Sequence, residues 1–134
     1  MFEKDPSLNL DKSPHSTHSI IPRLAGKKNA LVLDVGCNNG LIGREIIRLN
    51  QSSIDGIDIN GEALKEAGIS YRKVFKRDLY NSKLEIEAEK YDYIIFSDIL
   101  EHLPRPDLIL QDARNYLKDD GKLRLDNIYA CPRP

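Results

Sequence analysis

The feature that most constrains this chain is a stretch in which an apolar run, a glycine-bearing loop and a helical pattern follow one another directly. The stretch is Leu31–Gly43, Leu-Val-Leu-Asp-Val-Gly-Cys-Asn-Asn-Gly-Leu-Ile-Gly. The apolar run predicts a buried strand that carries Asp34 near its carboxyl end. Glycine lets backbone approach a ligand closely, and the next helix directs its first N–H groups toward the same place. This order is typical of a ligand site at the carboxyl edge of a parallel sheet.

The glycine spacing in this loop distinguishes between kinds of ligand. Gly36 and Gly40 enclose three residues with no glycine among them, so the Gly-x-Gly-x-x-Gly pattern of dinucleotide sites is absent. Asp34 precedes Gly36 by two residues, where a carboxylate would repel a pyrophosphate and attract an ammonium group. S-adenosylmethionine carries an ammonium and a sulfonium but no phosphate. The loop therefore favours this cofactor over NAD or ATP, and a dehydrogenase-like nucleotide domain is the weaker alternative.

Strand and helix patterns alternate from the glycine loop onward. This alternation predicts an α/β fold, a three-layer sandwich with a Rossmann-like, mostly parallel sheet of about five strands. The third strand is less apolar than the others and the fifth alternates charged with apolar residues, so both are expected at sheet edges. Strands are predicted at 30–35, 53–59, 70–76, 91–97 and 122–128, helices at 41–49 and 107–118, a short helix between an Asn60 N-cap and Gly68, and a turn at 119–121.

Length and composition indicate one globular domain without a strongly charged partner. The chain has 134 residues, a net charge of −1 and no apolar stretch of membrane-spanning length, so neither nucleic acid nor membrane is indicated. Residues 1–16 are polar and predict a flexible lead-in, which leaves 17–134 for the domain. Its two cysteines lack metal-ligand spacing, which predicts no metal site and a reduced, cytoplasmic setting.

The glycine loop resembles the first motif of the class I S-adenosylmethionine-dependent methyltransferases, commonly Leu-Asp-x-Gly-Cys-Gly-x-Gly. Leu33–Gly40 matches this motif except at Asn38, where the family usually has glycine. Asparagine tolerates left-handed backbone conformations well, so we expect the shape of the loop to be kept. The resemblance extends over about residues 30–128. Because the family fold usually continues with further strands and a helix, the resemblance implies a C-terminally shortened domain.

The resemblance also implies where the parts of S-adenosylmethionine bind. Its methionine half would lie against the glycine loop, its ribose against Asp58, and its adenine against Asp78 and the following backbone. From the residues alone, Asp58 has the alternative role of capping the next helix, and Asp78 that of a solvated loop residue. The predicted cofactor-binding residues are Asp34, Gly36, Cys37, Asn38, Gly40, Asp58, Ile59, Asp78, Leu79 and Ser97.

The segment Ser97–Leu103, Ser-Asp-Ile-Leu-Glu-His-Leu, follows the fourth predicted strand. It resembles the Asp-x-Leu-Glu-His-Leu segment of small-molecule and carbohydrate-related methyltransferases, which implies a place near the transferred methyl group and the acceptor. His102 is the candidate catalytic base, because histidine ordinarily exchanges protons near neutral pH. The alternative is that His102 and Glu101 only orient the loop, since methyl transfer depends mainly on in-line positioning.

The sequence therefore predicts an S-adenosylmethionine-dependent methyltransferase that transfers a methyl group to a small-molecule or other nucleophilic acceptor. The alternative is an inactive S-adenosylmethionine-binding module that acts as a partner or regulator, which Asn38 and the shortened fold favour. The exposed edge expected at the fifth strand also predicts pairing with a second copy or with a partner chain.

Overall fold

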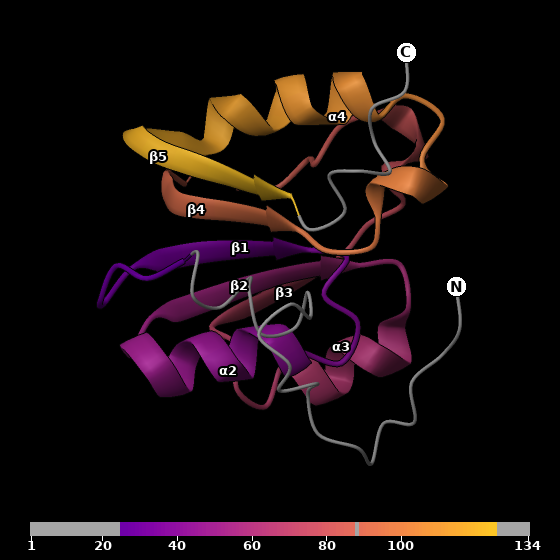
Figure 1. The fold of residues 1–134 in the computed structure, drawn as a ribbon. Helices are drawn as coiled ribbons and strands as arrows, with labels where there is room; N and C mark the ends of the chain where they lie inside the picture. The colour runs from indigo at the N-terminus through magenta and orange to yellow at the C-terminus, as the bar shows by residue number, and fades with distance from the viewer. Residues whose placement is uncertain (1–24, 88, 126–134) are drawn as a thin grey trace.

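The computed structural model describes residues 25–87 and 89–125, which form one sheet between two layers of helices (Figure 1). The strand order is β3-β2-β1-β4-β5, and every neighbouring pair is parallel. Helices α2 and α3 cover one face of the sheet and α4 covers the other (Figure 1). The predicted three-layer α/β sandwich with a Rossmann-like, five-stranded sheet is therefore confirmed.

The element bounds agree with the predicted ranges at most ends. The strands are β1 Leu31–Val35, β2 Ser53–Asp58, β3 Lys73–Lys76, β4 Tyr91–Phe96 and β5 Leu117–Leu125. The helices are α2 Leu41–Asn50, α3 Gly61–Ala67 and α4 Pro106–Ala113, with short 3-10 helices at Leu79–Asn81, Leu100–His102 and Arg114–Tyr116. The predicted lead-in over 1–16 and residues 17–24 lie outside the described residues.

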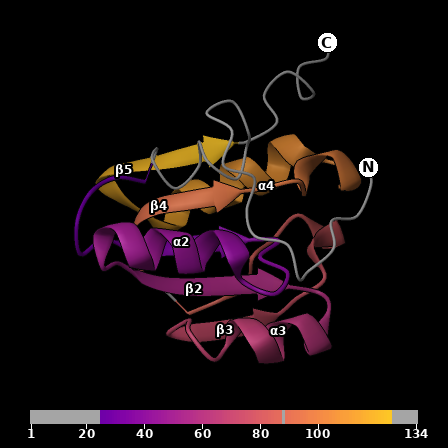
Figure 2. The ribbon, with the colours of Figure 1, turned by 60° about the horizontal axis from the view of Figure 1, so that its bottom comes forward.

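Alternate residues of the central strands face opposite helical layers, as expected for a sheet covered on both sides. Val32 and Ile95 lie in the core beneath α2 and α3, whereas Leu33 and Ile94 lie in the core beneath α4. Figure 2 shows α2 lying along the central strands and α3 beside β3. By the same alternation, Asp34 points toward the α2 and α3 side.

Helices α2, α3 and α4 begin with different local sequence signals. Asn60 caps α3 as predicted, because its side chain accepts hydrogen bonds from the N–H groups of Glu62 and Ala63. Helix α4 begins at Pro106, a residue suited to the first helical position. Helix α2 follows Gly40, which has no side chain to cap it. The first turn of α2 must therefore find its hydrogen-bond acceptors elsewhere in the fold.

Two expectations about element ends are corrected. Strand β3 begins at Lys73 rather than at residue 70, because Tyr71 turns inward and is buried in the core beneath α2 and α3. Helix α4 ends at Ala113 and continues as a 3-10 turn.

The predicted turn at 119–121 is instead an irregularity within β5. Tyr91 pairs with Leu117 and Tyr93 with Lys122, so the exposed residues between them bulge out of register. The part of the predicted fifth strand beyond Leu125 lies outside the described residues. Within the described part, β3 and β5 are the two sheet edges, as predicted.

Candidate cofactor-binding site

The carboxyl ends of β1 and β4 mark the point where the strand order reverses. From β1 the chain runs outward through β2 to β3, and then returns to the other side of β1 to form β4 and β5. Connections that diverge in this way leave a crevice at the carboxyl edge, which is where open α/β sheets bind ligands. Asp34 and Gly36 lie at the end of β1, Ser97 follows β4, and Asp58 ends β2. The fold therefore brings these four predicted residues to one edge.

Asp34 is a buried carboxylate with one oxygen left open. The Tyr71 hydroxyl donates a hydrogen bond of 2.6 Å to its Oδ2. Its Oδ1 is buried and has no hydrogen-bond partner among the described residues. Burial raises the pKa of Asp34 to about 7, the hydrogen bond from Tyr71 acts against this rise, and the negative charge of Asp58 adds to it. A cation bound at Oδ1 would favour the ionised form of this carboxylate.

Ser97 presents a second buried group of the same kind. Its side-chain Oγ, at the end of β4, is buried without a hydrogen-bond partner in the described part of the chain. Buried polar atoms are nearly always paired, so an unpaired carboxylate oxygen and an unpaired hydroxyl on neighbouring strands indicate a polar ligand. The ammonium and carboxylate of an amino acid group offer a donor and an acceptor to these two atoms. The residues present therefore fit the methionine half of S-adenosylmethionine.

The glycine loop has the backbone conformation that the motif predicted. Gly36 and Gly40 have φ angles of +79° and +92°, and Asn38 has a φ of +53°, in the left-handed region. A Cβ on Gly36 would lie 2.9 Å from the Cβ of Ile99, and one on Gly40 would lie 3.2 Å from the backbone of Ala67. The loop thus packs closely against the segment after β4 and against α3. Asn38 keeps the left-handed shape at the position where glycine is usual.

Asp58 ties the end of β2 to the glycine loop. Its Oδ2 accepts a 2.7 Å hydrogen bond from the Asn38 N–H, and its Oδ1 accepts a 2.9 Å hydrogen bond from the Asn60 N–H. The cap of α3 is supplied by the side chain of Asn60, so the alternative capping role of Asp58 is wrong. Each carboxylate oxygen can accept a second hydrogen bond, which leaves capacity for ribose hydroxyls.

The other predicted cofactor residues differ widely in exposure. Cys37 is buried, and burial raises the pKa of its thiol, which keeps it neutral at physiological pH. Ile59 is 60% exposed, an unusual apolar surface next to Asp58. Asp78 accepts a 3.1 Å hydrogen bond from the Tyr80 N–H and caps the 3-10 turn in which Leu79 is buried. Asp78 is therefore not merely a solvated loop residue.

His102 lies at the end of the 3-10 helix that follows β4. Its backbone N–H donates to the carbonyl of Ile99, and its side chain is 61% exposed with Nε2 3.9 Å from Oε2 of Glu101. The imidazole is therefore accessible from solution on the segment that follows Ser97. The contact with Glu101 is long, so it restrains the imidazole weakly.

The sequence patterns do not point to Tyr71 or to the buried partners of Asp55. Tyr71, which was grouped with the third strand, contacts Asp34, the carboxylate of the glycine motif. Asp55 is fully buried within β2 and receives hydrogen bonds from Arg72 and Tyr91. An acid inside an apolar strand signals that a partner exists. The sequence pattern around Asp55 contains nothing that identifies that partner.

Two further findings concern metal sites and membrane-spanning helices. Among the described residues, no three side chains of His, Cys, Asp or Glu gather as a metal site would require. None of the helices in 25–87 and 89–125 has the length and apolar character needed to cross a membrane.

Comparison with solved structures shows the same fold. The coclaurine N-methyltransferase bound to N-methylheliamine and S-adenosylhomocysteine matches with a TM-score of 0.72 and 20% identity, over 92% of this chain and 38% of that one. A TehB-like S-adenosylmethionine-dependent methyltransferase from Corynebacterium glutamicum matches with a TM-score of 0.68 and 19% identity, over 81% of this chain and 60% of that one.

Comparison with curated proteins and family models identifies the family. The ubiquinone biosynthesis O-methyltransferase of Glaesserella parasuis is 33% identical over 114 residues, and that of Actinobacillus pleuropneumoniae is 35% identical over 114 residues. Each match covers 78% of this chain and 47% of the relative, so the chain spans about half the length of these relatives. A family model described as a methyltransferase domain matches residues 12–129. Because that match covers most of the chain, this protein belongs to the class I S-adenosylmethionine-dependent methyltransferases.

Proposed function

We propose that this chain binds S-adenosylmethionine and takes part in methyl transfer to a hydroxyl group of a small molecule. The observation that carries the proposal is the pair of buried, unpartnered atoms in the described structure, Oδ1 of Asp34 and Oγ of Ser97, at the carboxyl ends of neighbouring strands. When bound, S-adenosylmethionine supplies an electrophilic methyl group on its sulfonium. The hydroxyl class of acceptor is suggested by the curated relatives, which are named O-methyltransferases.

Each residue at the carboxyl edge has a role that its contacts support. Asp34 accepts a hydrogen bond from the cofactor ammonium, and Ser97 donates one to its carboxylate. The left-handed loop from Gly36 to Gly40, with Cys37 and Asn38 between them, brings backbone close to the methionine half. Asp58 accepts from the ribose hydroxyls with its free lone pairs, because its two present bonds use only part of its acceptor capacity.

We assign the adenine end of S-adenosylmethionine to the exposed surface beyond the carboxyl ends of β2 and β3. Ile59 offers an apolar side chain next to Asp58, and Asp78 with the backbone of Leu79 offers polar contacts. His102, exposed on the segment after β4, accepts the proton of the acceptor hydroxyl as the methyl group is transferred.

The cofactor assignment is tested by titrating the protein with S-adenosylhomocysteine in a calorimeter. Asp58→Ala should weaken binding by about 1.5–3 kcal/mol, because charge-assisted hydrogen bonds are lost. Glu62→Ala is the matched control, since Glu62 is an exposed acid nearby on α3. Equal affinities for wild type and Asp58→Ala would remove Asp58 from the site. Binding without transfer to any hydroxyl acceptor would instead support the inactive, regulatory alternative.

The role of His102 is tested with His102→Ala once an acceptor is available. Removal of a base that acts in the transition state should lower kcat by roughly 10²–10⁴-fold and leave the affinity for S-adenosylhomocysteine unchanged. Wild-type turnover in this variant would favour the alternative in which His102 only orients its loop.

The proposal includes a partner at the β5 edge, either a second copy or another chain. Within the described residues β5 pairs only with β4, and an open edge favours further pairing. Light scattering that shows a monomer at high protein concentration would contradict self-pairing. The proposed setting is the cytoplasm, where a free thiol such as that of Cys37 stays reduced.

A further inference from the structure

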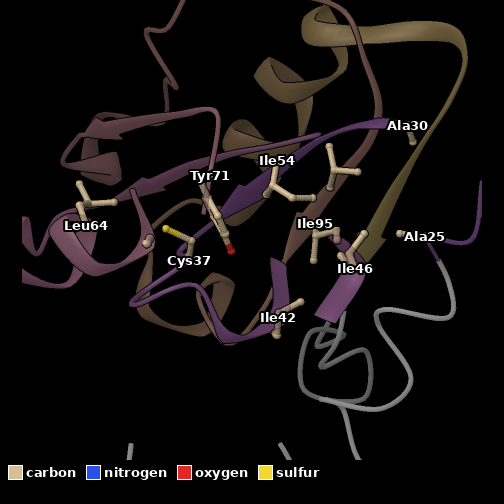
Figure 3. Close-up of a cluster of buried hydrophobic side chains, with 11 residues drawn as sticks. Ala25, Ala30, Cys37, Ile42, Ile46, Ile54, Leu64, Tyr71 and Ile95 are labelled. Atoms are coloured by element: carbon tan, nitrogen blue, oxygen red, sulfur yellow. The ribbon is translucent and has the colours of Figure 1, made fainter. Parts of the chain in front are cut away.

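Tyr71 lies at the centre of the core beneath α2 and α3, although no sequence motif marks it. Figure 3 shows its ring beside Cys37, among the side chains of that cluster. Its hydroxyl donates a 2.6 Å hydrogen bond to Oδ2 of Asp34 and accepts a 3.1 Å hydrogen bond from the Gly43 N–H. A single buried hydroxyl thus contacts the strand before the glycine loop and the helix after it.

The contact with Gly43 replaces a missing helix cap. Gly40 precedes α2 and has no side chain, so the N–H groups of the first turn lack the usual acceptor. Gly43 is the third residue of the helix, and its N–H is one of the donors that have no acceptor within the helix. The Tyr71 hydroxyl accepts from it across 28 residues of sequence.

Glycines at two positions make room for the tyrosine. A Cβ on Gly43 would lie 2.1 Å from the Tyr71 hydroxyl oxygen, and a Cβ on Gly56 would lie 2.8 Å from its ring. Gly56 is also the strand neighbour of Asp34 in the β1–β2 register. Two elements therefore lack a side chain at the places where the ring must pass to reach Asp34, which makes the contact a property of the packed fold.

We propose that Tyr71 is a positioning residue of the cofactor site, whose hydroxyl holds the Asp34 carboxylate and the first turn of α2 in fixed relation across the glycine loop. With Oδ2 committed to Tyr71, only Oδ1 of Asp34 is left to accept from the cofactor ammonium. This inference rests on the proposed function, because it assigns Tyr71 to the site that binds S-adenosylmethionine.

The ionisable groups around Asp34 predict how the pH dependence of cofactor binding would change if the Tyr71 hydroxyl were removed. These groups are Tyr71, which favours the ionised carboxylate by donating to it, and Asp58, whose negative charge disfavours it; the neutral thiol of Cys37 lies beside them. Without the hydroxyl, the pKa of Asp34 rises further above about 7. Binding of an ammonium to ionised Asp34 would then require a higher pH.

The decisive comparison is between Tyr71→Phe and Tyr91→Phe. Each variant is titrated with S-adenosylhomocysteine from pH 5.5 to 8.5, a range that extends about 1.5 units on either side of the Asp34 pKa. Tyr91 is the matched control, because its buried hydroxyl donates a 2.7 Å hydrogen bond to another buried carboxylate, Asp55. Tyr71→Phe should raise the midpoint of the pH dependence by about one pH unit, so that it binds about 5-fold more weakly at pH 7 and recovers its affinity at higher pH. Tyr91→Phe should keep the wild-type affinity and midpoint.

The outcomes separate this inference from the function on which it rests. Wild type that fails to bind S-adenosylhomocysteine overturns both. Wild-type binding with an unchanged midpoint in Tyr71→Phe overturns the inference alone, and so does a weakening of equal size at every pH, which a purely structural role would produce.

A measurement on the wild-type chain keeps the proposal testable if Tyr71→Phe does not fold. In protein with ¹³C-labelled tyrosine, the Cζ resonance of Tyr71 should titrate with Asp34 at a pH of about 7, and saturating S-adenosylhomocysteine should move that transition to lower pH. The Tyr91 resonance should not respond to the ligand. A Tyr71 resonance that is unaffected by bound ligand would overturn the proposal.

Discussion

Two buried aspartates on neighbouring strands, Asp34 on β1 and Asp55 on β2, have opposite surroundings. Both receive a hydrogen bond from a tyrosine hydroxyl, of 2.6 Å at Asp34 and 2.7 Å at Asp55. Asp55 also receives hydrogen bonds of 2.9 Å and 2.7 Å from Nε and Nη2 of Arg72, so both of its oxygens are occupied. Asp34 has no cation among its described contacts, and its Oδ1 is unpartnered there.

This contrast separates a structural carboxylate from one that is available to a ligand. Arg72 also contacts Glu89, and Lys73 contacts Glu87 and Glu89, so Asp55 belongs to a network of paired charges that joins β2, β3 and the segment before β4. Burial of an acid within a strand is common to both residues. The two residues differ in whether each of their carboxylate oxygens has a hydrogen-bond partner among the described residues.

The largest effect is expected from Asp55→Ala. This change leaves the Tyr91 hydroxyl without its acceptor and the Arg72 guanidinium with only its contact to Glu89, and it should lower the free energy of unfolding by about 2–4 kcal/mol. The figure is at the lower end for a buried ion pair because the Arg72 side chain is 38% exposed and can reach water. Urea unfolding measures the change. Affinity for S-adenosylhomocysteine should not change, and a loss of affinity in the folded variant would remove the distinction between the two aspartates.

Asp34→Asn should have the next largest effect, and on binding rather than on folding. Loss of the charged acceptor should weaken the binding of S-adenosylhomocysteine by about 1.5–3 kcal/mol, which corresponds to roughly 10- to 150-fold. The amide still accepts from Tyr71, so the core contact is kept. Calorimetry and urea unfolding of the same preparations measure the two quantities. A large loss of stability with unchanged affinity would show that Asp34, like Asp55, is structural.

The pH dependence of stability should also distinguish Asp34 from a fully paired carboxylate. The folded pKa of Asp34, about 7, lies above its ordinary value of 3.8, so the folded state binds more protons between these values. Stability should therefore fall as pH rises from about 4 to about 7, by about 1–3 kcal/mol in the absence of ligand. Asp34→Asn should lack this component. Urea unfolding of both proteins at pH 5 and pH 8 measures it, and identical pH dependence would contradict the assignment.

The smallest effect is expected at the loop itself. Asn38 already has the left-handed φ of +53° that glycine adopts freely, so Asn38→Gly should change stability by less than about 0.5 kcal/mol. Asn39→Gly is the control at the neighbouring position, which does not have a positive φ. There the added freedom of the unfolded chain should lower the free energy of unfolding by about 0.5–1 kcal/mol. If Asn38→Gly proves the more costly of the two, the asparagine side chain must make a contact that holds the loop.

The local parts of the site and their order along the chain follow from the sequence alone. The apolar run, the glycine loop and the following helix occupy adjacent residues, and their periodicity and turn chemistry depend on near neighbours alone. The same local rules predicted Asn60 as a cap and placed Asp58 at the end of the second strand. Because parallel strands bring their carboxyl ends to one edge, these short-range signals were sufficient to predict where Asp34, Asp58 and Ser97 would meet.

Which of these groups are fully hydrogen-bonded within the fold, and which keep an unpaired oxygen, depends on long-range packing. Tyr71 meets Asp34 across 37 residues and Tyr91 meets Asp55 across 36, distances over which local patterns carry no information about partners. Strand register and helix crossovers decide these pairings, and the irregular pairing of β4 with β5 has the same origin. Two aspartates that look alike in the sequence therefore differ because long-range packing placed Arg72 beside one and no cation within the described residues beside the other.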